Sequence, residues 1–160
     1  MKYYFKTISV FLLFFFITSF IVNEQNKLKT GFYYLADKED GSELIKDVDG
    51  EDTFAVDKRE ILTVNDFSDA KFVIRNAKPN PIKIIELKLT KVGRKKWLEI
   101  KNQLSSSGES VVFICNDKIY LEKTISGSNN IENSTIDLLI ESKYQEEVIK
   151  VIKSEINDSR

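Results

Sequence analysis

The sequence predicts an α+β protein, with a mixed or antiparallel sheet that carries two helices on one face and follows a small β-rich subdomain. Three observations predict it. Short strand-like segments separated by turn residues fill the first half of the body. Two later segments place apolar residues at the three- and four-residue spacing of helices. From Ile82 onward the order is strand, helix, strand, strand, strand, helix, which is typical of the α+β class.

The first 22 residues have the pattern of a leader. Lys2 and Lys6 precede the apolar run 8–22, ISVFLLFFFITSFIV, and no acid occurs in this part of the chain. A basic start before an apolar stretch of roughly 7–15 residues is typical of a secretory signal, and a spanning helix needs roughly 20. We therefore expect an exported protein of the periplasm or cell envelope. Residues 1–22 are its signal peptide or its anchor in the cytoplasmic membrane, and residues 23–29 form a tether.

The segment 30–77 is expected to be a small β-rich base region. Asp-Gly pairs at 40–41 and 49–50 favour tight hairpin turns between its short strands, and Asn65 can cap a short helical turn at Asp66–Ala70. The expected strands are Gly31–Leu35, Glu43–Lys46, Thr53–Val56, Ile61–Val64 and Lys71–Asn76. Both prolines of the chain lie in 78–81, which is therefore the best internal boundary.

The segment 82–156 is expected to form the α+β domain itself. The continuous apolar run Val111–Ile114 is typical of a central strand, and Ser142 and Gln145 have the spacing of a capping box at the start of the last helix. The expected strands are Ile82–Leu89, Ser110–Cys115, Lys118–Lys123 and Thr135–Ile140. The two helices run from Thr90 to about Leu104, with Trp97 on the apolar stripe, and from Ser142 to Ile156.

The composition excludes several kinds of chemistry. The 160 residues contain no histidine and one cysteine, Cys115, so a Ser-His-Asp triad, an imidazole metal site and an internal disulfide are all impossible. The net charge is -1, and without the leader the balance is 22 basic to 25 acidic residues, which gives no bulk attraction for nucleic acid. We expect a non-enzymatic protein with no cofactor and no metal.

Four local motifs have an ordinary structural explanation that we prefer. The acidic run 47–52 offers oxygen ligands around Gly50, but it lacks the helix-flanked calcium pattern and fits a solvated turn. Acid pairs such as Glu146-Glu147 are adjacent in sequence and show no convergence for acid-base catalysis. The basic residues around Trp97 fit a solvated helix face, and Cys115 fits a buried small hydrophobic residue.

Three blocks of the chain resemble the first periplasmic domain of the SecD/SecDF protein-export membrane component, over roughly Thr30 to Ile156. The first is Gly31–Leu35 with Ile61–Ala70, the second is LKLTKVGRKKWLEIKNQL and the third begins with VVFICNDKIYLEKTISG. The sequence departs from the family pattern at Asn116-Asp117-Lys118, where the family has Asp-Gly-Lys, and at Gly127-Ser128, where it has a double glycine. The resemblance implies a head-like α+β domain over 82–156 that touches an exported chain. Proton-driven transport does not carry over, because the family's six-helix membrane bundle has no counterpart here.

The resulting hypothesis is an exported SecDF head-like protein that binds a polypeptide at the cell envelope. Exposed loops carry function more often than cores do, so the expected contact positions are Asn116, Asp117, Lys118, Gly127, Ser128, Asn129 and Asn130. An edge strand of the sheet could also pair with an extended chain. Nucleic acid and small-molecule substrates are not expected, and contact with the membrane is expected only through residues 1–22, if this segment is not cleaved. The alternatives are an exported hydrolase with convergent carboxylates and a structural domain without a partner.

Overall fold

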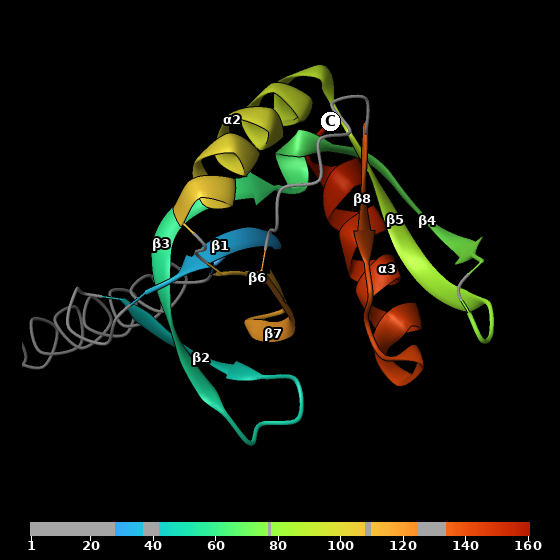
Figure 1. The fold of residues 1–160 in the computed structure, drawn as a ribbon, viewed down its shortest axis with the longest axis horizontal. Coiled ribbons are helices and arrows are strands. Elements are labelled where there is room, and N and C mark those ends of the chain that lie inside the picture. The colour runs from blue at the N-terminus through green and yellow to red at the C-terminus, as the bar shows by residue number, and fades with distance from the viewer. Residues whose placement is uncertain (1–27, 37–41, 77, 108–109, 125–133) are drawn as a thin grey trace, which may run out of the picture.

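The computed structural model describes residues 28–36, 42–76, 78–107, 110–124 and 134–160, which form a barrel and a separate sheet with two helices (Figure 1). The strands are β1 (Gly31–Leu35), β2 (Glu43–Asp47), β3 (Thr53–Thr63), β4 (Phe67–Arg75), β5 (Ile82–Leu89), β6 (Ser110–Cys115), β7 (Lys118–Thr124) and β8 (Thr135–Leu138). The helices are η1 (Val64–Asp66, a single 3₁₀ turn), α2 (Lys91–Ser107) and α3 (Ser142–Asp158). The α+β class is confirmed.

Five strands close into a barrel in the order β1-β3-β2-β7-β6. Every neighbouring pair is antiparallel except β2 and β7, where Lys46 lies opposite Lys118 in a parallel pairing. Because side chains alternate between the two faces of a strand, one set fills the barrel and the other points outward. The buried side chains that pack together inside the barrel are Tyr33, Ile45, Val56, Val112, Ile114 and Ile119.

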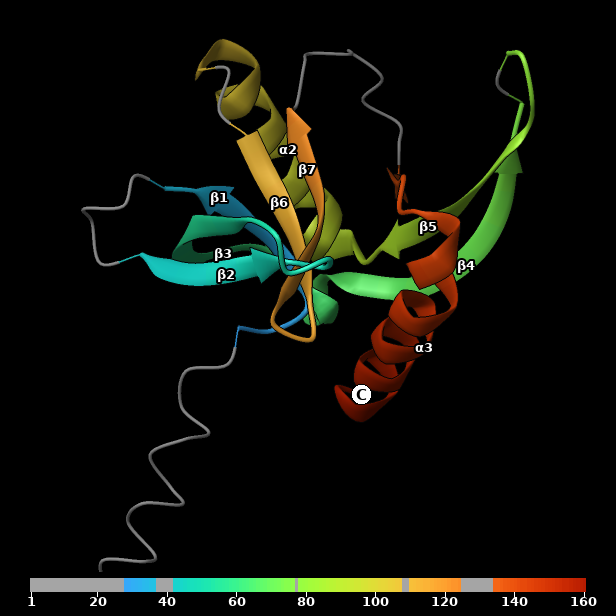
Figure 2. The ribbon, with the colours of Figure 1, turned by 90° about the horizontal axis from the view of Figure 1, so that it is seen from below.

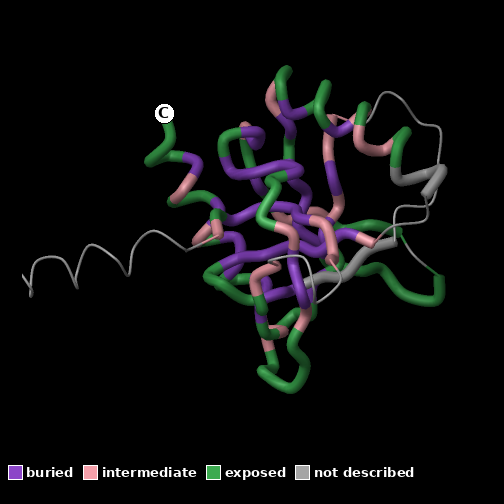
Figure 3. The backbone as a smooth tube through the Cα atoms, turned by 90° about the vertical axis from the view of Figure 1, so that its left-hand side faces the viewer, coloured by how far each residue is buried: buried purple, intermediate pink, exposed green. Residues whose placement is uncertain are grey.

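The outward set of the barrel helps to form a second and larger core. The Phe32 ring centroid lies 5.1 Å from that of Phe113, 5.7 Å from that of Trp97 on α2 and 6.5 Å from that of Phe67 on β4. This core also contains Ile85, Leu87 and Leu89 of β5 and the apolar side of α3. The buried segments therefore converge on the centre of the molecule, while the turns and hairpin ends are exposed (Figure 3).

The remaining three strands form an antiparallel sheet in the order β4-β5-β8. Helix α3 packs against β4, β5 and the barrel strand β6, so it lies between the sheet and the barrel. Helix α2 packs against β3, η1 and the end of β5. Seen from below, the far end of the β4–β5 hairpin extends away from the rest of the protein as a curved arm (Figure 2).

The expected single sheet with two helices on one face is wrong. Strands β6 and β7 belong to the barrel and β4 joins the sheet, so segments before and after residues 78–81 contribute to both. The physical reason lies in β6, whose two faces are both buried: Val112 and Ile114 point into the barrel, and Phe113 points into the larger core. A strand buried on both faces shows no alternation that would identify its partners.

Two local predictions are also wrong, and each is overridden by a contact between distant residues. Residues 67–70 belong to β4 rather than to a helical turn, because Phe67 and Ala70 pair with Leu89 and Leu87 of β5. Ser142 does not cap α3, which has Glu141 at its N-cap position and no capping side-chain hydrogen bond. The Gln145 side chain is buried, and its Nε2 donates to the carbonyl oxygens of Lys83 and Ile140 at 2.9 and 2.8 Å.

Candidate functional site at the barrel turn and the open sheet edge

The predicted contact residues Asn116, Asp117 and Lys118 form the exposed turn between β6 and β7. Asn116 and Asp117 have φ angles of 51° and 57°. Two consecutive positive φ values are typical of the type I′ hairpin turn, and asparagine and aspartate tolerate this conformation better than other side chains do. The turn lies where β7 meets β2, because the Val48 amide donates to the Ile119 carbonyl at 2.9 Å.

The second predicted contact segment, Gly127, Ser128, Asn129 and Asn130, lies outside the described residues, as do Asp40 and Gly41. Its flanking strands are described. Strand β7 ends at Thr124 in the barrel, and Ser134 accepts a hydrogen bond from the Leu89 amide at 2.8 Å beside the sheet. The described residues on either side of this segment therefore lie one in the barrel and one beside the sheet.

Asp49, in the acidic run 47–52, joins the β2–β3 turn to the start of α3. Its carboxylate accepts hydrogen bonds from the Tyr144 hydroxyl and, at 3.1 Å, from the Lys143 ammonium group. The Tyr144 hydrogen bond, followed by that of Lys143, holds the pKa of Asp49 below its ordinary value. Gly50 follows with a φ of 77°, as a tight turn requires. Within the described ranges, no group of three or more acidic or cysteine side chains is placed to hold a metal ion.

We expect Asp49→Asn to lower stability near neutral pH and to lose this effect in acid. A carboxyl group with a lowered pKa in the folded state stabilises the fold above its unfolded pKa of about 4, and this contribution disappears as the pH falls through the folded value. Urea unfolding of both proteins from pH 2.5 to 7 measures the difference. Glu51→Gln, at an exposed position in the same turn, is the control. A difference between wild type and Asp49→Asn that stays constant down to pH 2.5 would contradict the assignment.

The first turns of the basic cluster on α2 form a solvated face, as expected, with one exception, while Lys101 further along the helix is half-buried. Lys91, Arg94 and Lys95 are exposed, and Trp97 on the opposite side is buried in the larger core. The exception is the Lys96 ammonium group, which lies 2.9 and 3.0 Å from the two carboxylate oxygens of Asp66. Asp66 is itself buried and accepts a hydrogen bond from the Thr63 amide at 3.2 Å.

The start of α2 is fitted closely against this buried acid. The Thr90 amide donates to the Asp66 carbonyl at 2.8 Å, and the Thr90 hydroxyl accepts from the Gly93 amide at 3.0 Å, as an N-cap does. A side chain at Gly93 would overlap the backbone of Asp66 and lie 2.9 Å from its Cβ. The spacing Thr-x-x-Gly is therefore explained by a cap and a close approach of two backbones.

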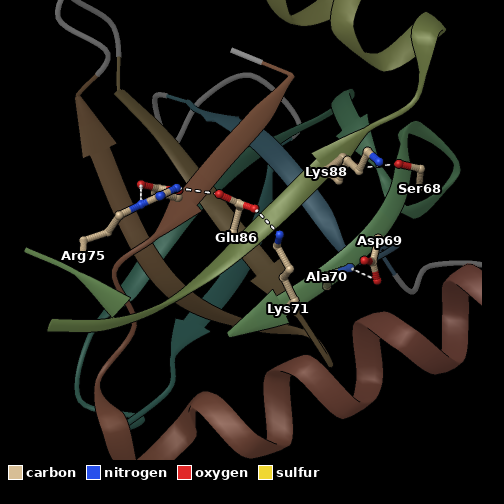
Figure 4. Close-up of polar contacts among 8 residues, drawn as sticks. Ser68, Asp69, Ala70, Lys71, Arg75, Glu86 and Lys88 are labelled. Carbon is tan, nitrogen blue, oxygen red and sulfur yellow. Dashed lines mark hydrogen bonds and ion pairs between the residues drawn. The ribbon is translucent and has the colours of Figure 1, made fainter. Parts of the chain in front are cut away.

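One face of the three-stranded sheet carries an ion-pair network that sequence reasoning missed (Figure 4). Glu86 on β5 lies 3.2 Å from the Lys71 ammonium group and 2.5 Å from the Arg75 guanidinium group, both on β4. Arg75 also reaches Asp137 on β8 at 2.9 Å, so the network joins all three strands. The two carboxylates that converge here are thus both engaged by one guanidinium group. Only the strand pairing brings these residues together, so no sequence spacing could have revealed them.

The outer edge of β4 is the second feature that a binding function could use. Among the described strands β4 pairs with β5 alone, and its other edge carries no strand. Ile74 near the end of this edge is 72% exposed, and Ile82 opposite Arg75 is also exposed. An exposed edge with apolar side chains is a template for another strand.

A closed barrel joined to a separate helix-covered sheet defines a class of fold rather than an activity. No protein-family model and no curated protein sequence matches the chain. Among solved structures, that of the membrane component SecDF that enhances protein export matches with a TM-score of 0.57 and 16% identity, over 79% of this chain and 64% of that one. A crystal structure of SecDF in its super-membrane-facing form matches with a TM-score of 0.53, also at 16% identity, over 78% of this chain and 18% of that one.

The similarity to SecDF is one of fold. It concerns the periplasmic region of SecDF, and this chain spans less than two thirds of either SecDF chain. Within the described part of the chain, the helices are all too short or too polar to span a membrane.

Proposed function

We propose that this chain is an exported, non-enzymatic protein that binds a polypeptide at the cell envelope in a role related to protein export. The observation that carries the proposal is the fold, which the chain shares with the periplasmic region of SecDF, a component that enhances protein export. The basic and apolar pattern of residues 1–22 supports export across the cytoplasmic membrane. Whether this leader is cleaved decides between a released and a membrane-anchored protein, and mass spectrometry of the mature N-terminus distinguishes the two.

Two surfaces are proposed to contact the polypeptide. The first is the turn Asn116–Lys118, which is exposed and held in a fixed hairpin conformation by the β6–β7 pair. The second is the segment Gly127–Asn130, which remains a prediction from the sequence. Fixed, exposed turns on a rigid scaffold are the usual place for binding residues.

The alternative of a carboxylate hydrolase would need two acids in different environments around an accessible space. Glu86 and Asp137 lie near each other, but both bind Arg75, and Glu86 binds Lys71 as well. This arrangement supports a structural role for the two acids, and we propose no catalytic residue.

Photocrosslinking tests the proposed function. We expect a photoreactive amino acid at position 118 or 129 of the full chain to crosslink a reduced, alkylated and therefore unfolded protein, and to leave the same protein in its folded form unlabelled. Position 153, which is exposed on α3, serves as the matched control and is expected to give little product. Equal labelling at 153 would contradict the proposed surfaces. Absence of labelling at all three positions, together with no binding in solution, would contradict polypeptide binding.

A further inference from the structure

The second half of β4, Lys71–Arg75, is an edge that the fold leaves open to a partner. In the described part of the chain, the sheet order β4-β5-β8 gives β4 one neighbour. A strand at the edge of a sheet presents a row of backbone donors and acceptors that only another strand can satisfy as a ladder. Proteins that do not use such an edge usually protect it.

The first half of β4 is protected in this way. The register of the β4–β5 pair is irregular between Phe67 and Asp69, and such an irregularity interrupts any regular ladder on that strand. The Arg160 guanidinium group donates to the Ser68 carbonyl at 2.6 Å, so the end of the chain covers a backbone acceptor there. The Ala70 amide donates to the Asp69 carboxylate at 2.8 Å, so the protection extends as far as Ala70.

The second half carries apolar side chains instead of protection. Ile74 is 72% exposed, and Phe72 on the same face is half-buried, with the Lys83 ammonium group 3.7 Å above its ring. Lys71, Val73 and Arg75 alternate with them and point to the opposite face. The edge thus offers Ile74 as exposed apolar surface beside the half-buried Phe72 on one face. On the other face it offers the exposed sides of Lys71 and Arg75, whose charges Glu86 and Asp137 balance in part.

The open edge is also held rigid. Glu86 bridges Lys71 and Arg75, and Arg75 continues the network to Asp137 on β8 (Figure 4). The network fixes both ends of the segment Lys71–Arg75 against the rest of the sheet. A preformed edge binds more tightly than a mobile one, because less conformational entropy is lost on binding.

From this geometry we propose that the Lys71–Arg75 edge binds an extended segment of another polypeptide by strand addition, with apolar residues of the segment beside Phe72 and Ile74 and acidic residues beside Lys71 and Arg75. The inference rests on the proposed function and adds to the two turn surfaces a third contact site, with the mode of binding used there. Main-chain hydrogen bonds supply affinity in this mode, and alternate side chains supply selectivity.

A second copy of this chain is a poor occupant of the edge. If two β4 strands pair antiparallel about Val73, the middle of the open segment, Lys71 of each copy lies opposite Arg75 of the other. Like charges directly opposite each other in a sheet are destabilising. A partner strand with acidic residues opposite Lys71 and Arg75 would instead be stabilised by opposite charges.

The test uses the full chain and an end-blocked ten-residue peptide that alternates valine with glutamate, followed by fluorescence anisotropy. We expect Ile74→Lys, which places a protective charge on the edge, to weaken binding at least about tenfold. N-methylation of alternate peptide amides is expected to do the same, because it removes the donors of the ladder. Leu44→Lys is the matched control, since Leu44 is an exposed apolar strand residue of the barrel, 61% exposed. Hydrogen exchange of residues 71–75 should slow when the peptide is bound.

The outcomes separate this inference from the proposed function. Equal binding by wild type and Ile74→Lys, or an equal loss in Leu44→Lys, overturns the assignment of the edge. If the wild-type chain nevertheless binds the unfolded protein, the proposed function holds, but the Lys71–Arg75 edge is not its binding site. A chain that binds neither the peptide nor the unfolded protein contradicts both. A dimer that sedimentation detects in wild type and not in Ile74→Lys would make a second copy the occupant and overturn the proposal.

Discussion

Phe32→Ala is expected to lower the free energy of unfolding by about 4 kcal/mol, because removal of a fully buried aromatic ring costs its transfer free energy and leaves a cavity. Phe32 has no exposed surface and its ring contacts those of Phe67, Trp97 and Phe113. These three partners come from the sheet, from α2 and from the barrel, so the ring joins these three parts of the fold. Urea unfolding followed by tryptophan fluorescence measures the loss, because the chain has one tryptophan, Trp97.

The matched control for Phe32 is Phe54→Ala on β3. Phe54 is half-buried and packs against the smaller core inside the barrel. Less apolar surface is lost there, and we expect a cost of less than about 2 kcal/mol. Similar losses in the two variants would mean that the aromatic cluster around Phe32 is not the main junction between the layers.

The second large effect is expected at Gly31, where Gly31→Ala should cost about 3 kcal/mol, the upper part of the range for overpacking. An added Cβ would overlap the Leu62 carbonyl oxygen and lie 2.9 Å from the Cα of Thr63. Both obstacles are backbone atoms of β3, so no side-chain rotation relieves the contact. Gly31 pairs with Thr63 on one side and with Ile114 on the other, and the variant therefore strains two pairings of the barrel at once.

Gly50→Ala separates this steric effect from glycine's conformational freedom. Nothing lies within 4 Å of an added Cβ at Gly50, but its φ of 77° strains any other side chain. We expect a cost of about 1 kcal/mol. If chemical denaturation gives Gly31→Ala no greater cost than Gly50→Ala, the close approach of β1 and β3 is relieved by a small backbone shift.

The sequence predicted individual elements better than their assembly. Three strands have the bounds that the apolar patterns indicated: Gly31–Leu35, Ile82–Leu89 and Ser110–Cys115. Burial of one or both faces of a strand determines which neighbouring residues are apolar, so the local pattern is enough to predict it. Their partners depend on contacts between distant residues. Asp66 illustrates this: it looked like the start of a helical turn, but its carboxylate binds Lys96, which lies 30 residues later on α2.

In the candidate site too, local features could be predicted from the sequence and contacts between distant residues could not. The turn at Asn116 and Asp117 could be predicted, because these residue types favour positive φ angles wherever a hairpin needs them. The network around Glu86 could not, since its members come from three strands and have no common spacing. The unpaired edge of β4 could not be predicted either, because it depends on which strands pair with β4 and not on the sequence of β4 itself.

The pairing of β1 with β6 has a consequence for how the chain folds. Gly31 lies opposite Ile114, so the barrel is closed by a strand pairing between residues that are more than half the chain apart. A chain that emerges N-terminus first completes β1, β2 and β3 well before β6 and β7 exist. Contacts of such high sequence separation slow folding, and until they form the unpaired strands are prone to aggregation. The first half of this protein therefore cannot complete its barrel until β6 and β7 have been made.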